Sequence, residues 1–280
     1  KDKVMLGRIT REAESLTING SGIQGIQSIS ANYASTAQFL NNLGVNDVKY
    51  APQGPQQAVI DVNTMLTHTL SPSAPTLSTE MMYGFTGDFP FSGVVGHGSK
   101  KFIFTEGYMQ SYSVNCAIGQ IPTISTSSVI YGEFGTGDLT NLPTDFYPSQ
   151  LNIPSYSSME INLNEFTTNR VLSFNIDVAT PRIPVYAVGL DVPTGVIAAT
   201  PVEVNVSFDI EPDDYEIKNM RFVPEETVFR DTTITLKKNN SDITLLTYSF
   251  EDMLLTSESF QGNSNSNASI NFNLRSFILR

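Results

Sequence analysis

The chain has 280 residues and carries 16 Lys and Arg against 28 Asp and Glu, a formal net charge of −12. A protein that grips nucleic acid broadly needs basic side chains to displace phosphate counterions, so this acidic excess excludes that role. Only 16% of the residues are charged, Gly, Pro, Ser, Thr and Asn are plentiful, and no stretch of ten residues has helical periodicity. These features together predict an all-β protein with many loops.

Cys116 is the only cysteine, which excludes an internal disulfide and suits a protein that folds by packing alone in a reducing cytoplasm. No run approaches 18 apolar residues and no apolar signal core follows Lys1, so we expect neither a membrane span nor secretion. The acidic excess is uneven, with 10 acidic against 7 basic residues in 1–140 and 18 against 9 in 141–280. Solubility is the ordinary interpretation of this excess, and guidance of DNA by repulsion is the alternative.

Alternating apolar residues predict strands in two groups. In chain order we expect two strands within 16–33, then strands at 58–66, 101–106, 108–117, 124–134, 159–164, 170–178, 184–188, 201–210, 231–237, 242–250, 253–261 and 268–278. Residues 67–98 lack a steady period and predict a long functional loop with a short helix at 77–83. A second short helix is expected at 211–220, because a proline and several acids stand in its first turn.

The two groups of strands read as one unit written twice. Gly44 and Gly189 are 145 residues apart, as are Val59 and Val204, and Ile29 and Ile176 are 147 apart. Phe102-Ile-Phe104 likewise corresponds to Tyr248-Ser-Phe250 at a shift of 146. A period this long indicates two whole domains rather than a solenoid. We therefore expect a first domain at 1–140, a linker at 141–158 and a second domain at 159–280.

No catalytic or cofactor site emerges from the motifs. Gly20-Ser-Gly-Ile-Gln-Gly25 matches the dinucleotide fingerprint in its letters, but an alternating strand pattern follows it, which favours a turn. His68 and His97 have no partner at metal-ligand spacing, so no metal is expected. Cys116 lies in a predicted strand and is better explained as a small buried apolar residue than as a nucleophile. We expect a protein that is not an enzyme and has no cofactor.

Two stretches resemble the tail tube proteins of tailed bacteriophages. One is Ser173-Phe-Asn-Ile-Asp-Val followed by Arg182, Pro184, Gly189 and Pro201-Val-Glu-Val-Asn-Val-Ser-Phe208. The other runs from Lys101-Phe-Ile-Phe through Gly119-Gln-Ile-Pro122 to Val129-Ile-Tyr-Gly132. The first copy departs from the pattern, with Thr36-Ala-Gln-Phe39 where the second has Thr180-Pro-Arg-Ile-Pro184.

The resemblance implies two tandem β-sandwich or barrel domains, each with one short helix. It further implies that three chains form a pseudo-hexameric ring, that sheet edges pair between subunits, and that rings stack into a tube for DNA ejection. In that family the lumen tends to be acidic, so the candidate acidic or lumen residues are Asp209, Glu211, Asp213, Asp214 and Glu216. The candidate ring-stacking residues are Pro72, Pro75, Met81, Met82, Tyr83, Phe85, Phe89 and Phe91.

The expected partners are further copies of the chain and other tail proteins (terminator, baseplate and tape measure), with DNA only passing through and no membrane. The expected location is the virion tail, assembled in the host cytoplasm. One alternative is a tail terminator or baseplate ring protein of the same fold. Another is a duplicated carbohydrate-binding β-sandwich, for which the 11 tyrosines leave room although the chain has no tryptophan. An enzyme is the third alternative.

Overall fold

A computed structural model describes residues 14–34, 37–41, 48–52, 57–67, 90–97, 100–136, 153–154, 159–163, 166–190, 192–211, 229–238, 243–263 and 266–278. All regular secondary structure in these residues is β, which confirms the predicted class. None of these residues belongs to a helix long and apolar enough to cross a membrane. The two short helices expected at 77–83 and 211–220 lie outside the described residues, apart from Glu211, which follows a strand.

The strands fall into two groups along the chain. Those of the first half are β1 (Glu14–Ile18), β2 (Ser21–Gly22), β3 (Ile26–Ala34), β4 (Ala37–Asn41), β5 (Val48–Pro52), β6 (Gln57–Met65), β7 (Phe91–His97), β8 (Lys100–Ala117), β9 (Thr123–Ile130) and β10 (Phe134–Thr136). Those of the second half are β11 (Met159–Leu163), β12 (Phe166–Thr168), β13 (Val171–Ala179), β14 (Arg182–Val185), β15 (Gly195–Ala198), β16 (Val202–Ile210), β17 (Phe229–Lys237), β18 (Thr244–Asn263) and β19 (Ser266–Ile278).

The pairing of the first group recurs in the second. The first half has the order β3-β6-β9-β8-β7-β1-β2, and every neighbouring pair is antiparallel. The second half has β13-β16-β19-β18-β17-β11-β12, again antiparallel throughout. Each half also contains a separate two-stranded hairpin at the same point in its order, β4–β5 and β14–β15. Only the short β10, which pairs with β8, has no counterpart in the described part of the second half.

Backbone irregularities recur at the same positions. The register of β8 against β9 slips between Met109 and Ser111, and that of β18 against β19 slips between Leu255 and Ser257. A few residues earlier, Glu106 has φ 53° and Asp252 has φ 49°, which is uncommon for residues other than glycine. Each of these pairs of positions is 146 residues apart. Bulges bend a strand and change its direction. Here β8 pairs with β7 before the bend and with β9 after it, and β18 pairs with β17 before the bend and with β19 after it, so each passes from one layer of the fold to the other.

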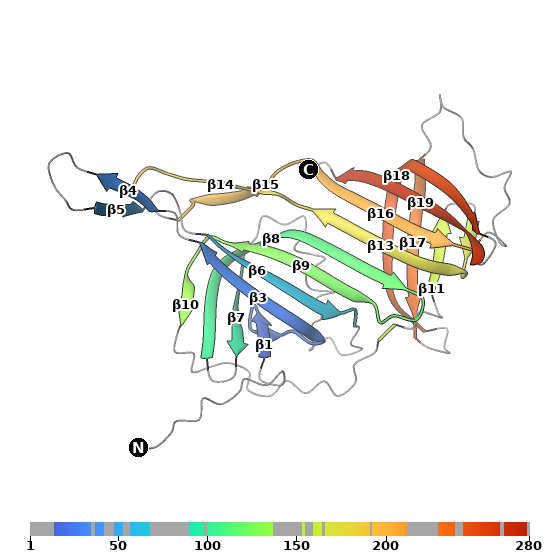
Figure 1. Cartoon of the computed structure of the whole chain (residues 1–280), viewed down its shortest axis with the longest axis horizontal. Helices are drawn as coiled ribbons and strands as arrows, with labels where there is room; N and C mark the ends of the chain where they lie inside the picture. Colours follow the sequence, from blue (N-terminus) through green and yellow to red (C-terminus); the bar gives the residue numbers. More distant parts are fainter. Residues whose placement is uncertain are drawn as a thin grey trace, which may run out of the picture.

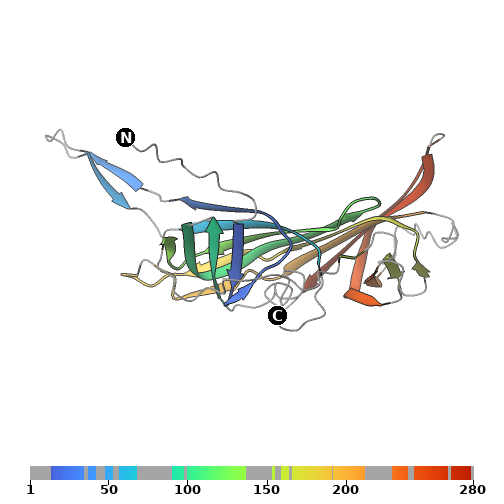
Figure 2. The same ribbon diagram turned by 90° about the horizontal axis from the view of Figure 1, so that it is seen from below.

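The two halves share one long sheet because β8 pairs with β13. Its eight strands follow the order β3-β6-β9-β8-β13-β16-β19-β18. Figure 1 shows these strands running side by side, with β1 and β7 crossing beneath one end and β11 and β17 beneath the other. Seen from below, β1 and β7 again cross the long strands of the first half (Figure 2). The crossing strands therefore cover one face of the long sheet.

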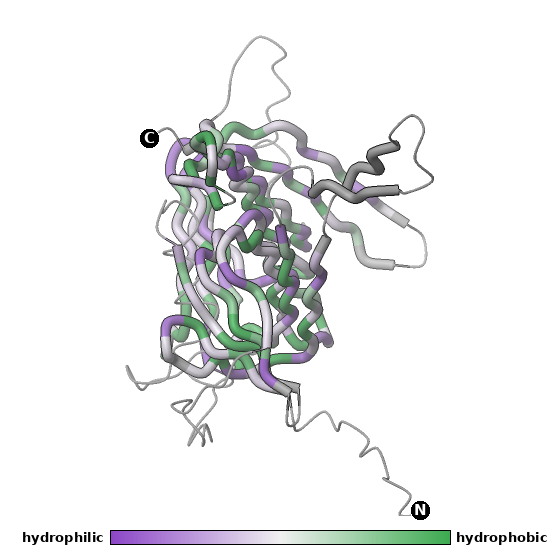
Figure 3. Tube along the Cα trace, turned by 90° about the vertical axis from the view of Figure 1, so that its left-hand side faces the viewer, coloured by the Kyte–Doolittle hydropathy of each residue, from purple (hydrophilic) through white to green (hydrophobic). Residues whose placement is uncertain are grey.

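The core lies between the long sheet and the crossing strands, as one apolar cluster that includes residues of both halves. Strand β16 shows the pattern most clearly, since Val202, Val204, Val206, Phe208 and Ile210 are each at most 2% exposed, as their alternation predicts. Figure 3 shows the same alternation of apolar and polar residues along many strands. The β-branched and aromatic residues of these strands pack well on a pleated surface.

Core contacts also join the halves directly. The hydroxyls of Tyr112 and Tyr248 are 3.2 Å apart in the buried interior, and the Cys116 thiol lies 3.3 Å from the Met159 sulfur. Cys116 is 1% exposed, and burial raises the pKa of its thiol to about 11. The structure thus confirms that Cys116 is a small buried residue, since a reactive cysteine needs an accessible thiolate.

Several strands differ from the sequence-based prediction. The stretches predicted as separate strands at 101–106 and 108–117 form the single strand β8, and those at 242–250 and 253–261 form most of β18. The expected loop at 67–98 was wrong at its end, where residues 91–97 form β7. Hairpin β4–β5 and strand β15 were not predicted, because four or five residues of mixed polarity carry too little periodicity. The hairpin predicted around 237–242 is present between β17 and β18.

The structure also corrects two equivalences between the halves. Val204 is buried in the core, whereas Val59 lies on the opposite, partly exposed face of β6, and the residue that matches Val204 in pairing and burial is Ala58. Likewise Ile29 corresponds to Phe174, because each is the second residue after a bulge that precedes Ser28 or Ser173. Two alternating sequences can be misaligned by one residue and still look similar, but such a shift moves every side chain to the opposite face of the sheet.

Candidate functional site

The candidate functional surface of the described chain is the face of the long sheet that the crossing strands leave uncovered, here called the polar face. It carries small polar side chains from all eight strands: Ser28, Ser30, Asn32, Asp61, Asn63, Ser111, Ser113, Asn115, Thr123, Ser125, Ser127, Ser173, Asn175, Asp177, Glu203, Asn205, Ser207, Asp209, Ser257, Ser259, Gln261, Asn271, Asn273 and Arg275. They alternate with the core residues along each strand and form a continuous polar surface across the halves.

Hydrogen bonds tie the first half of the polar face together across its strands. The carboxylate of Asp61 accepts from the Ser127 hydroxyl at 2.7 Å and from the Ser30 hydroxyl at 3.3 Å. In the next row, the Asn63 amide donates to Ser28 at 3.0 Å and accepts from Ser125 at 2.6 Å. Each row therefore links β3, β6 and β9 through side chains as well as through the backbone.

The second half repeats this arrangement with its own residues. Asp209 accepts from the Ser173 hydroxyl at 2.7 Å and from the Asn271 amide at 2.8 Å. The Asn273 amide donates to Asn271 and to Ser257, at 2.8 Å and 2.7 Å. These bonds connect β13, β16, β19 and β18. Cross-strand hydrogen bonds of this kind stabilise a sheet modestly and fix the side chains in place.

The polar face is acidic and has little positive charge. Among its described residues there are four carboxylates, those of Asp61, Asp177, Glu203 and Asp209, and one cation, Arg275. The Arg275 guanidinium is already held by Glu203 at 2.8 Å and lies over the Phe277 ring at 4.7 Å. The pKa of Glu203 is lowered by hydrogen bonds from Asn205 and Arg275, so it stays ionised. Such a surface binds water well and repels a polyanion weakly.

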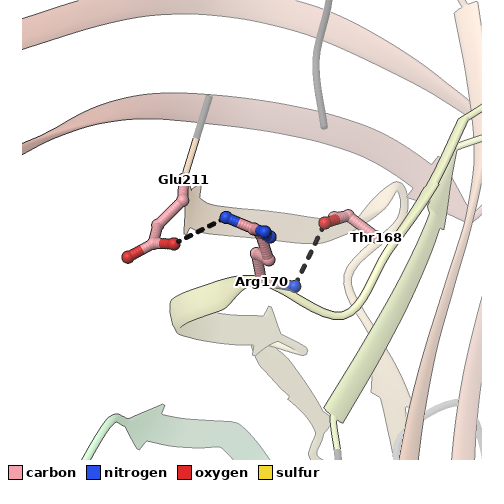
Figure 4. Close-up of polar contacts among 3 residues, drawn as sticks. All are labelled: Thr168, Arg170 and Glu211. Carbon is pink, nitrogen blue, oxygen red and sulfur yellow. Dashed lines mark hydrogen bonds and ion pairs between the residues drawn. The ribbon is translucent and has the colours of Figure 1, made fainter. Parts of the chain in front are cut away.

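The sequence-predicted acidic residues divide among different environments. Asp209 lies on the polar face, as described above. Glu211 follows β16 and contacts the Arg170 guanidinium at 3.5 Å, while the Arg170 backbone N–H donates to the Thr168 hydroxyl at 3.1 Å (Figure 4). Glu211 therefore ties the end of β16 to the start of β13. Asp213, Asp214 and Glu216 lie outside the described residues.

The predicted ring-stacking loop is described at only one of its candidate residues. Phe91 begins β7 and packs edge-to-face on Phe104 with ring centroids 5.8 Å apart, against the main core. Its assignment to ring stacking stays a prediction. Pro72, Pro75, Met81, Met82, Tyr83, Phe85 and Phe89 lie outside the described residues.

The two outer edges of the long sheet are not paired with any described strand. Strand β3 pairs only with β6, and residues 255–263 of β18 pair only with β19. Apolar residues that face the core side are exposed at both edges: Tyr33 is 44% exposed on β3, and Phe260 is 51% exposed on β18. Open edges of this kind invite pairing with another chain.

Hairpin β14–β15 of the second half lies on the first half. Val196 belongs to a buried cluster with Tyr108, Val129 and Tyr131. The Arg182 Nε donates to the Met109 carbonyl at 2.7 Å, so a nearly buried charge finds a partner across the halves. The other side of the hairpin is apolar and exposed, with Ile183 and Ile197 opposite each other and 49% and 50% exposed.

Sequence reasoning missed the polar face and the free edges. The sequence contained a signal for the polar face, because Ser, Asn and Asp occupy every second position of the predicted strands. That pattern indicates only ordinary solvent exposure as long as the order of the strands in the sheet is unknown. The described residues hold no cluster of three or more His, Cys, Asp or Glu that could bind a metal ion. Comparison with protein-family models and with curated protein sequences gave no match for this chain.

Proposed function

We propose that this chain is the structural subunit of a hollow tube, the tail tube of a bacteriophage, and that the polar face lines its channel. The observation that carries this proposal is the continuity of one bare, acidic face across eight strands contributed by both halves. Two domains, at 1–140 and 159–280 with a linker between them, would act as successive wedges of the wall. Three chains would then give six quasi-equivalent segments.

The distribution of mass supports an inward orientation of the polar face. The crossing strands β1, β7, β11 and β17 add a second layer to one face only. When a sheet closes on itself, the outer perimeter is longer than the inner one, so the thicker side fits best on the outside. The polar face then forms the inner wall.

An inner wall of this composition suits passage of DNA without capture. Binding of duplex DNA depends on release of counterions by basic side chains, and the one described cation of the polar face, Arg275, is held by Glu203. Four carboxylates repel phosphate only within a screening length of about 8 Å in physiological salt. Hydroxyl and amide groups keep the wall hydrated, so a polyanion would slide past bound water.

The purified full-length protein tests this proposal by negative-stain electron microscopy. We expect open-ended tubes or stacked rings with a central channel. Single closed rings that never stack would favour the tail terminator or baseplate alternative. A protein that stays monomeric at all concentrations, or particles without a channel, would overturn the proposal.

A further inference from the structure

The contact between the two halves of the chain provides a template for a contact between two chains. At this junction β13 pairs with β8 over seven residue pairs, from Ser173–Ala117 to Ala179–Ser111. Its core side buries Phe174 and Ile176 at 1% exposure and Val178 at 8%. The strand that supplies the other side, β8, buries Val114 and Cys116 at 0% and 1%. One edge thus docks on the other through both backbone and core contacts.

Each outer edge of the long sheet is the counterpart of one side of that junction. Strand β3 corresponds to β13, because both pair with the following long strand after the same bulge, at Ser28 and Ser173. The second part of β18 corresponds to that of β8, because both slip against their neighbour at positions 146 residues apart. The long sheet therefore has two complementary free edges, β3 and the second part of β18, at its opposite ends (Figure 1).

We propose that β3 of one chain pairs antiparallel with residues 257–263 of β18 in a second copy of this chain, in the register of the internal junction. Transfer of that register places Ala31 opposite Phe260, Tyr33 opposite Glu258 and Ser28 opposite Asn263 in the second copy. The inference rests on the internal junction and names the contact by which the proposed ring closes.

Burial at three positions supports this register. Phe260 occupies the position of Val114, which is completely buried at the internal junction, yet Phe260 is 51% exposed. Tyr33 occupies the position of Val178, and its exposure is 44% against 8%. Ala31 is exposed where Ile176 is buried. Among the described residues of the long sheet, core-side residues are exposed only at the two edges where the next half is missing, although Glu258 on the same side of β18 is already buried at 6% exposure. The small Ala31 leaves space for the large Phe260.

The hairpins support the same contact independently. At the internal junction, hairpin β14–β15 covers Tyr131, which is 4% exposed. The residue 146 positions further on is Phe277, which is 46% exposed. Hairpin β4–β5 stands before β6 as β14–β15 stands before β16. The β4–β5 hairpin of the chain that supplies β3 would therefore cover Phe277 of the second copy.

A head-to-tail contact of this kind joins unlike surfaces, so it continues until the ring closes or a helical filament forms. The two edges of one chain cannot meet each other, because the remaining six strands of the long sheet separate them. The occupant of each edge is accordingly another copy of the same chain.

Disulfide trapping in the full-length chain tests the register. Directly opposite residues on antiparallel strands have Cα atoms about 4.5–5.5 Å apart, which is within the range of a disulfide. Residues two positions out of register lie too far apart to form one. We expect the double variant Ala31→Cys with Phe260→Cys to give a ladder of cross-linked chains on non-reducing gels that ends in a closed species. The matched control, Ala31→Cys with Gly262→Cys, keeps the same strands but is out of register and should give at least tenfold less product. A mixture of the two single variants of the first pair should give dimers only.

The outcomes separate this inference from the proposed function. Channel-containing particles in which the first pair does not cross-link, or in which the control cross-links equally well, would overturn the register while leaving the tube intact. Efficient cross-linking into closed particles without a channel would uphold the junction and overturn the tube. Monomers without any cross-link would overturn both.

Discussion

The substitution Phe260→Asp tests the role of the free edge of β18 without disturbing the folded chain. Phe260 is 51% exposed on the core side of β18, opposite the buried Ile270 of β19. The half of the ring already covered contributes about 1 kcal/mol, so the free energy of unfolding of the isolated chain should fall by roughly that amount while the chain stays folded. Assembly, by contrast, should fail.

The expected loss follows from the area still open to water. Full burial of a phenylalanine side chain contributes about 1.5–3 kcal/mol, and roughly half of this surface remains to be covered, which gives about 1 kcal/mol per contact. The aspartate would in addition be desolvated without a partner, at a cost of roughly 2–3 kcal/mol or more. Together these terms weaken each contact by roughly 3–4 kcal/mol, on the order of a few hundredfold in the association constant.

Sedimentation velocity of the variant beside the unaltered protein measures this effect, with urea unfolding as the check on folding. Ser259→Asp is the matched control, because the neighbouring residue points to the polar face and its carboxylate would stay hydrated. Phe260→Leu should retain most assembly. If Phe260→Asp assembles with unchanged affinity, the edge of β18 is not a contact and the reasoning fails.

Three further predictions concern packing, charge and pH. Gly93→Ala should cost roughly 1–3 kcal/mol in urea unfolding, because a new Cβ would overlap the backbone and ring of its neighbours, whereas Gly135→Ala meets nothing within 4 Å and should be neutral. The double variant Asp61→Lys with Asp177→Lys leaves two carboxylates and three cations on the described polar face. Its assembled particles should therefore retain duplex DNA in co-sedimentation at low salt. Unchanged DNA binding would contradict the placement of the polar face on the inner wall. Burial raises the pKa of Cys116 from 9.0 to about 11, so the folded chain keeps a proton that the unfolded chain releases. The contribution of Cys116 to stability should therefore be constant below pH 9 and fall between pH 9 and 11, and the Cys116→Ala variant should lose that part of the decline.

Much of the fold follows from local patterns. The alternation of Val202 through Ile210 specifies a strand with one buried face whatever it packs against, because adjacent side chains of a strand point to opposite sides. The repeat near 146 residues was likewise visible in the Phe102 and Phe250 regions, since homologous cores keep similar apolar residues at similar spacing. Composition alone was enough to disfavour broad binding of nucleic acid.

The sequence could not determine the exact alignment of the halves or the course of the long strands. Val59 and Val204 align as letters, but only their opposite faces in the sheet reveal the slip of one residue. Glu106 and Asp252 look like strand breaks, yet each bends a strand that continues, because different strands pair with it on the two sides of the bend: β7 and then β9 for β8, β17 and then β19 for β18.

The sequence by itself determined an acidic, duplicated, β-rich chain, because period, composition and spacing are local properties. Only the tertiary structure decided that the Ser, Asn and Asp residues of eight strands share one face, and that Tyr33 and Phe260 stand exposed at opposite edges. Both features depend on the order of the strands, and that order is set by pairing between segments well separated along the chain, such as β8 with β13.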